Sequence, residues 1–193
     1  MEALWATILF SGFALEVIIR QIKRMEEKSI ESLAEELGRA ALKHGARIAT
    51  AESCTAGGIS YAITSVPGSS GWFDRGFVTY TERSKIEMLG VPMGVIRSRG
   101  VVSEDVAAAM AQGALDRSDA AYTVAVTGIA GPDGAEPDKP VGTVCFGFAE
   151  RTASGIVIES ETCHFTGDRA AVRESTVRQA LAGLLKRINE TSL

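Results

Sequence analysis

Hydrophobic and polar residues follow two spacings along the chain, and these predict helices and short strands. Residues 29–43 place apolar side chains three and four positions apart, as in an amphipathic helix, and Ser29 supplies a capping side chain. Residues 46–51 and 122–126 are largely apolar, which is typical of strands buried on both faces. The same spacings predict helices over 58–65, 82–89, 103–115 and 168–188, and strands over 76–80, 141–149 and 155–165.

About five strands with helices between most of them predict an α/β fold, layered α/β/α around a mixed sheet. The last two strands follow one another like a hairpin, so the sheet should contain antiparallel as well as parallel pairs. The chain has 193 residues and shows no internal repeat or linker. We therefore expect a single domain over residues 25–193.

Residues 1–24 are expected to be an addition to this domain. Residues 3–19 are nearly all apolar, but they include Glu16 and are too few for a convincing membrane-spanning helix. Glu2 and the missing small-residue cleavage pattern are unlike a secretory signal. We interpret the segment as an extra N-terminal apolar helix that packs on another copy of the chain, giving a homo-oligomer. A membrane-associated anchor is the alternative.

Charge and cysteine usage narrow the class of function. The net charge is −4 and the basic residues are scattered, so nothing favours nucleic acid as a partner. Cys54, Cys145 and Cys163 are odd in number and show no C-x-x-C spacing, which argues for a reducing, cytoplasmic compartment and against a zinc site. His44 and His164 are the only histidines, and neither lies in a motif. We therefore expect neither a metal nor a cofactor.

The stretch T-A-E-S-C-T-A-G-G at 50–58 contains the first candidate for chemistry. Ser53 lies between a predicted strand and a predicted helix that begins with glycines. Free backbone N–H groups and the helix dipole at such a point favour negative charge, which suits a nucleophile whose attack creates an oxyanion. A serine that merely caps the helix is the simpler interpretation.

Lys85 is the second candidate, at the end of Y-T-E-R-S-K over 80–85. A lysine that is partly buried beside a hydroxyl can lose its proton near neutral pH and act as a base. A Ser–Lys pair also needs no histidine. The alternative is an ordinary solvated lysine on a helix surface.

The third candidate is T-G-I-A-G-P-D-G over 127–134, which follows a buried strand. Its glycines allow backbone N–H groups to converge on an anion or a carbonyl oxygen. It matches neither the P-loop nor the dinucleotide-binding pattern. A long connection made of turn residues is the alternative.

Together with S-V-P-G-S-S-x-W-F-x-R-G-F-V-T-Y, K-P-V-G-T-V and F-x-G-D-R, these motifs resemble the CinA C-terminal domain family over roughly residues 30–190. Stand-alone members include nicotinamide mononucleotide amidohydrolases. The resemblance implies hydrolysis of the carboxamide of this nucleotide to nicotinate mononucleotide and ammonia, in pyridine nucleotide salvage and without a metal or cofactor. Longer members are named for competence and DNA damage, and they suggest the alternative of a catalytically silent nucleotide-binding or regulatory module.

The resemblance also implies roles for individual residues. It makes Ser53 the nucleophile and Lys85 its base, with Tyr80 as a third catalytic residue. Arg169 would hold the 5′-phosphate through its planar fork of donors. The remaining residues expected to bind the substrate are Thr55, Thr127, Gly128, Ala130 and Gly131.

Three positions need separate expectations. Glu82 stands where the family usually has Asn, which leaves a substrate contact from this position open. Ala56 stands where Gly is commoner, and we expect this change to be neutral. Cys54 is expected to be buried rather than nucleophilic, because adjacent side chains in a strand-to-helix turn point apart.

Overall fold

Five short segments pair into one sheet in the order β2-β1-β3-β4-β5 in the computed structural model, which describes residues 28–190. The strands are β1 (Ile48–Glu52), β2 (Phe73–Val78), β3 (Tyr122–Gly128), β4 (Thr143–Thr152) and β5 (Gly155–His164). The helices are α2 (Ile30–Lys43), α3 (Gly58–Thr64), α4 (Glu82–Leu89), α5 (Met93–Arg99), α6 (Glu104–Asp116) and α7 (Arg169–Glu190), and a short 3-10 turn covers Ser69–Gly71.

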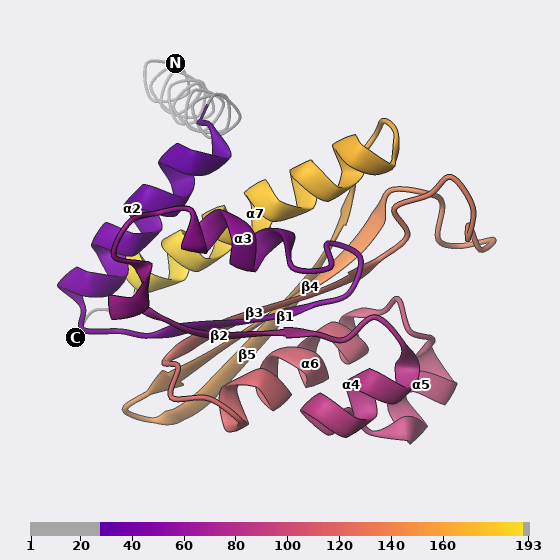
Figure 1. Cartoon of the computed structure of the whole chain (residues 1–193). Helices are drawn as coiled ribbons and strands as arrows, with labels where there is room; N and C mark the ends of the chain where they lie inside the picture. The colour runs from indigo at the N-terminus through magenta and orange to yellow at the C-terminus, as the bar shows by residue number, and fades with distance from the viewer. Residues whose placement is uncertain (1–27, 191–193) are drawn as a thin grey trace, which may run out of the picture.

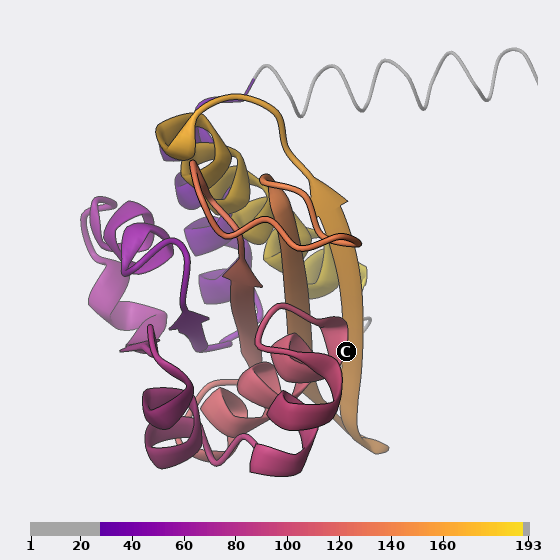
Figure 2. The same ribbon diagram turned by 90° about the vertical axis from the view of Figure 1, so that its right-hand side faces the viewer.

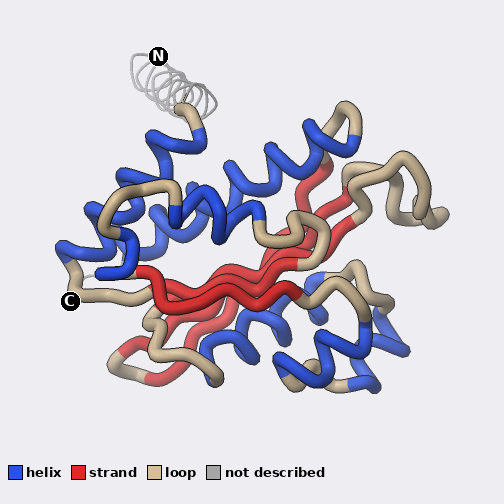
Figure 3. The backbone as a smooth tube through the Cα atoms, in the orientation of Figure 1, coloured by secondary structure: helices blue, strands red, loops and turns tan. Residues whose placement is uncertain are grey.

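The sheet is mixed. Strand β1 lies between β2 and β3 and pairs in parallel with both, whereas β4 pairs antiparallel with both β3 and β5. Helices α2, α3 and α7 cover one face of the sheet, and α4, α5 and α6 cover the other (Figures 1 and 3). The predicted α/β/α fold with a mixed five-stranded sheet is therefore confirmed.

The two helix layers pack against the sheet differently. The core under α2 and α7 contains large side chains, including Trp72, Phe146 and Phe148. The buried residues of the core under α6 are alanine, valine, leucine, isoleucine and methionine, with no aromatic side chain among them. At Gly147 in β4, an added Cβ would lie 2.2 Å from the carbonyl oxygen of Ala107, so only glycine lets α6 approach this strand so closely.

Most helix starts agree with local sequence signals. The Ser29 hydroxyl accepts the Ser32 N–H, and Ser103 caps α6 in the same way. Helix α4 covers the predicted residues and begins with a reciprocal capping box between Thr81 and Ser84.

Three elements differ from the prediction, and one of them is strand β4, which was predicted over 141–149 but lies over 143–152. Helix α5 was not predicted, because it is only seven residues long and buries one side chain, Ile96. Strand β2 was predicted over 76–80 but lies over 73–78. It is an edge strand and half-exposed, so it tolerates the polar Asp74 and Arg75, which hid its beginning in the sequence.

The expected packing of residues 1–24 lies outside the described residues. Between residues 28 and 190, no helix is both long enough and apolar enough to cross a membrane.

Candidate active site

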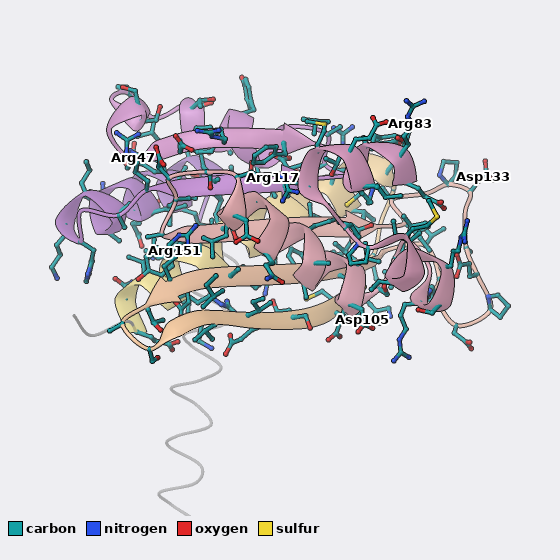
Figure 4. All side chains as sticks on the ribbon, turned by 90° about the horizontal axis from the view of Figure 1, so that it is seen from below. Arg47, Arg83, Asp105, Arg117, Asp133 and Arg151 are labelled. Carbon is teal, nitrogen blue, oxygen red and sulfur yellow. The ribbon has the colours of Figure 1, made fainter. Side chains whose placement is uncertain are left out.

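The carboxyl ends of the three parallel strands meet at one end of the sheet, where open α/β sheets build binding sites. Ser53 directly follows β1, the segment leading to Lys85 follows β2, and the glycine-rich loop follows β3. Figure 4 shows Arg83 of α4 and Asp133 of this loop at the same end of the molecule, while Arg47 and Arg151 lie toward the opposite end.

A cavity of about 260 Å³ lies at this end, a size that suits a small molecule rather than a polymer. It brings together most of the side chains predicted to form the site. The lining residues are Ser53, Cys54, Tyr80, Glu82, Lys85, Val101, Val102, Thr127, Gly128, Ala130 and Arg169.

Ser53 and Lys85 are in direct contact. Lys85 Nζ lies 2.9 Å from Ser53 Oγ and donates a second hydrogen bond of 2.7 Å to the carbonyl oxygen of Thr79. Lys85 is 1% exposed, and this burial lowers its pKa from 10.5 to about 8, against smaller opposing effects of Cys54 and Glu82. The two candidates named from the sequence are therefore direct neighbours, and the amine can exchange its proton close to neutral pH.

Backbone contacts hold this pair in place. The Thr79 N–H donates to the Glu52 carbonyl, which continues the β1–β2 pairing one residue beyond β2. The Ser53 N–H donates to the Val126 carbonyl of β3. Backbone hydrogen bonds at the ends of paired strands therefore fix both Ser53 and Thr79, whose carbonyl oxygen holds Lys85.

Cys54 is buried, as expected. Its thiol is 5% exposed, and burial raises its pKa to about 12, with a smaller contribution from the Glu52 charge. Because the thiolate is the reactive form of cysteine, this thiol is a poor nucleophile at neutral pH.

Arg169 and Tyr80 form the outer part of the cavity. The Arg169 guanidinium donates to the Gly131 carbonyl at 2.9 Å and to the Tyr80 hydroxyl at 3.1 Å. Among the described residues, no carboxylate pairs with Arg169, so its charge is available to an anionic ligand. The loop after β3 and the segment leading into α7 lie side by side, as Figure 2 shows.

Two of the predicted substrate-binding residues do not line the cavity. Thr55 is fully buried, and its hydroxyl donates to the Glu52 carboxylate at 2.7 Å. Gly131 contributes the carbonyl that holds Arg169. Thr127 does line the cavity, but its hydroxyl is engaged with the Val101 carbonyl at 2.9 Å.

The expectation of free N–H groups at the start of α3 is wrong. The Glu52 carboxylate accepts the N–H groups of Gly57, Ile59 and Ser60, so this helix end is already occupied. Sequence reasoning missed Glu52. The available signal was one acidic residue at the end of an apolar strand, with hydroxyl residues on both sides of it.

Ala56 lies in the same turn and has a φ of +50°, in the left-handed region. The backbone of residues other than glycine is strained in this region, because their Cβ atom comes too close to the following carbonyl oxygen. The alanine is therefore not a neutral replacement of glycine for the backbone, contrary to expectation.

Within residues 28–190, no three His, Cys, Asp or Glu side chains gather in a group that could hold a metal ion. The three cysteines are free thiols.

Known proteins resemble this chain over nearly all of the described residues. The family model for the CinA C-terminal domain matches residues 30–188. The chain belongs to this family. The nicotinamide-nucleotide amidohydrolase PncC of Pseudomonas putida is 49% identical over 157 residues, which are 81% of this chain and 96% of that protein.

Other relatives differ in length or are known as structures. A competence-damage inducible relative from Symbiobacterium thermophilum is 50% identical over 157 residues, 79% of this chain but only 37% of that protein. The crystal structure of the competence/damage inducible protein CihA from Agrobacterium tumefaciens superimposes with a TM-score of 0.77 at 42% identity. That match covers 83% of this chain and 96% of the other.

Proposed function

We propose that this chain hydrolyses the carboxamide of nicotinamide mononucleotide to nicotinate mononucleotide and ammonia, with Ser53 as nucleophile and Lys85 as its base. The observation that carries the proposal is the buried 2.9 Å contact between Ser53 Oγ and Lys85 Nζ in a small-molecule cavity. The name of the Pseudomonas putida relative, which this chain matches over almost its entire length, supports the substrate.

The first half of the reaction transfers the acyl group. The uncharged Lys85 amine accepts the hydroxyl proton of Ser53 as Oγ attacks the carboxamide carbon. The C–N bond then breaks, and Lys85 returns the proton to the nitrogen, so that ammonia leaves and an ester remains on Ser53. The hydrogen bond to the Thr79 carbonyl holds Nζ in reach of Oγ throughout.

The second half restores the serine. Water attacks the ester carbonyl, Lys85 accepts a proton from this water, and the proton returns to Ser53 Oγ as the nicotinate nucleotide leaves. Both halves need Lys85 without its proton. Its pKa of about 8 makes that form accessible near neutral pH, which a pKa of 10.5 would not.

Substrate binding is assigned to the outer part of the cavity. The exposed Arg169 guanidinium is suited to the 5′-phosphate because its planar donors match phosphate oxygens. Tyr80 accepts one of its N–H groups and thereby orients it. Thr127 and Gly128 at the end of β3, with Ala130 just after it, form a wall where the nicotinamide end can lie against the backbone.

Ammonia release from nicotinamide mononucleotide by the purified full chain tests the proposal, with and without EDTA. We expect equal amounts of ammonia and nicotinate mononucleotide and no effect of EDTA. The control is nicotinate mononucleotide, which has the same phosphate and ribose but no amide. Nucleotide binding without ammonia release would instead favour the regulatory module.

A further inference from the structure

The turn between β1 and α3 is built around one carboxylate. Glu52 is fully buried, and both of its carboxylate oxygens are surrounded by donors. Oε1 accepts hydrogen bonds from Thr50 Oγ1 (3.3 Å), Ser60 N (2.8 Å) and Ser60 Oγ (2.7 Å), and Oε2 accepts from Thr55 Oγ1 (2.7 Å), Gly57 N (3.0 Å) and Ile59 N (3.0 Å).

No cation neutralises this charge. Within the described part of the chain, Glu52 has no ion pair with a lysine or arginine. A buried carboxylate is costly unless hydrogen bonds compensate the lost water. All of its partners lie between Thr50 and Ser60, so the compensation depends on one conformation of the segment that carries Ser53.

Two further residues, Gly76 and Ala56, also affect the conformation of the turn between β1 and α3. Gly76 of β2 leaves space for the Ser60 hydroxyl, because an added Cβ would lie 2.3 Å from Ser60 Oγ. Ala56 stands in a left-handed conformation that alanine disfavours, so the turn needs contacts that hold it there. The carboxylate supplies them on both sides of Ala56, at Thr55 and Gly57.

Glu52 is also connected to both members of the Ser53–Lys85 pair. It precedes Ser53 in the chain, and its carbonyl accepts the N–H of Thr79, whose own carbonyl holds Lys85 Nζ. A shift of Glu52 would therefore change the distance between the serine oxygen and the lysine nitrogen.

We propose that Glu52 is a positioning residue, whose carboxylate holds the turn over 53–60 so that Ser53 Oγ stays within reach of Lys85 Nζ. This inference rests on the proposed function of that pair. It also gives Thr55 a different role from the one expected from the sequence: its hydroxyl supports Glu52 instead of contacting the substrate.

Two substitutions test the proposal, because loss of a positioning residue should lower kcat and leave KM nearly unchanged. Glu52→Gln replaces one acceptor by an NH₂ group that would face backbone donors, and should lower kcat at least about 100-fold while KM changes less than about three-fold. Thr55→Val removes one of the six hydrogen bonds and keeps the shape, and should lower kcat roughly five-fold with an unchanged KM.

Thr123→Val is the matched control for lost stability. It removes a buried hydrogen bond from Thr123 to the Ala111 carbonyl, away from the cavity. We expect a lower melting temperature and a kcat within about two-fold of the unsubstituted protein. If Glu52→Gln does not fold, Thr55→Val and Ser60→Ala decide the question.

The rate at which a fluorophosphonate probe labels Ser53 provides a second measurement that needs no amide substrate. We expect this rate to fall in parallel with kcat in the Glu52 and Thr55 variants. Labelling of the unsubstituted protein without ammonia release would reject the proposed substrate and leave the positioning role standing. Two results would overturn the positioning role. The first is a Glu52→Gln or Thr55→Val protein that is less stable but keeps its kcat and its rate of probe labelling. The second is a Thr55→Val substitution that changes only KM. An unsubstituted protein that neither releases ammonia nor reacts with the probe would overturn both proposals.

Discussion

The floor of the cavity and its rim are built in different ways. The floor consists of Ser53 and Lys85, which are 8% and 1% exposed and are held by hydrogen bonds to each other and to strand ends. The rim consists of Tyr80, Glu82 and Arg169, whose side chains reach solvent. Tyr80 lies between β2 and α4, Glu82 begins α4, and Arg169 begins α7. Burial shifts the pKa of an ionisable group, whereas an exposed charged group can bind a ligand from solution.

Under the proposed function, this contrast assigns the chemical step to the floor and recognition of the substrate to the rim. Changes in the floor should lower kcat with little effect on binding, and changes in the rim should act mainly on KM. Four substitutions in the floor and the rim test that division, and a fifth, at Ala56, tests the backbone of the turn that carries Ser53.

Ser53→Ala should have the largest effect, a loss of kcat of at least about 1,000-fold, because no other side chain on the floor can form the ester. Binding of nicotinamide mononucleotide, measured by calorimetry, should stay nearly intact. Cys54→Ala is the matched control and should keep most of the activity, since the raised pKa of this thiol keeps it protonated. A Ser53→Ala protein that retains its rate would show that a different group attacks.

Lys85→Arg should lower kcat by roughly 100- to 10,000-fold, because arginine keeps its proton at neutral pH and cannot act as a base. In the unsubstituted protein, kcat should rise with pH through about 8, where Lys85 loses its proton. The variant should lack this rise. Initial rates between pH 6 and 9.5 measure both, and a flat profile for the unsubstituted protein would exclude Lys85 as the titrating base.

Arg169→Ala should raise KM for nicotinamide mononucleotide roughly 10- to 100-fold and change kcat far less, as expected for loss of a charged hydrogen bond. Arg169→Lys keeps the charge without the planar fork and should recover part of the affinity. Nicotinamide riboside lacks the phosphate, so its KM should be the same for both proteins. An equal rise of KM for the riboside would make Arg169 a structural residue.

Glu82→Gln tests how the rim influences the floor. The Glu82 charge favours the protonated form of Lys85, so its removal should lower the pKa of Lys85 and move the rise of kcat to lower pH. We expect a shift of a few tenths of a pH unit, because the side chain is exposed and salt screens its charge. Glu87→Gln is the control, as Glu87 lies on the same helix and pairs with Arg83 instead.

Ala56→Gly should have the smallest effect, a gain of about 1 kcal/mol in the free energy of unfolding, because glycine adopts the left-handed conformation without strain. Urea unfolding of both proteins measures it. A loss of stability would mean that the flexibility of glycine in the unfolded chain outweighs the relieved strain.

Local signals in the sequence were sufficient to predict most of the helices and strands of this molecule. Helix starts at Ser29 and Ser103 depend on a capping side chain a few residues from its partner, and the buried strands depend on apolar runs. Because the motifs follow consecutive parallel strands, the meeting of Ser53 and Lys85 could also be predicted.

The remaining features depend on tertiary contacts that no local pattern reveals. Helix α5 has only seven residues, too few for an isolated helix to be stable, and it depends on the packing of Ile96 into the core. The partners of Glu52 converge only when the turn has formed, so the carboxylate and the true position of Thr55 were missed. Sequence reasoning thus identified Ser53 and Lys85 as candidates and missed the carboxylate of Glu52 beside them.

Interception of the ester on Ser53 tests the central claim most directly. Hydroxylamine added during turnover of nicotinamide mononucleotide competes with water for an acyl-enzyme. The account predicts a hydroxamate of the nucleotide that forms at the expense of nicotinate mononucleotide, and neither product with Ser53→Ala. Full-rate formation of nicotinate mononucleotide and ammonia with no hydroxamate at any hydroxylamine concentration would contradict it, because water would then attack the amide without an ester on the protein.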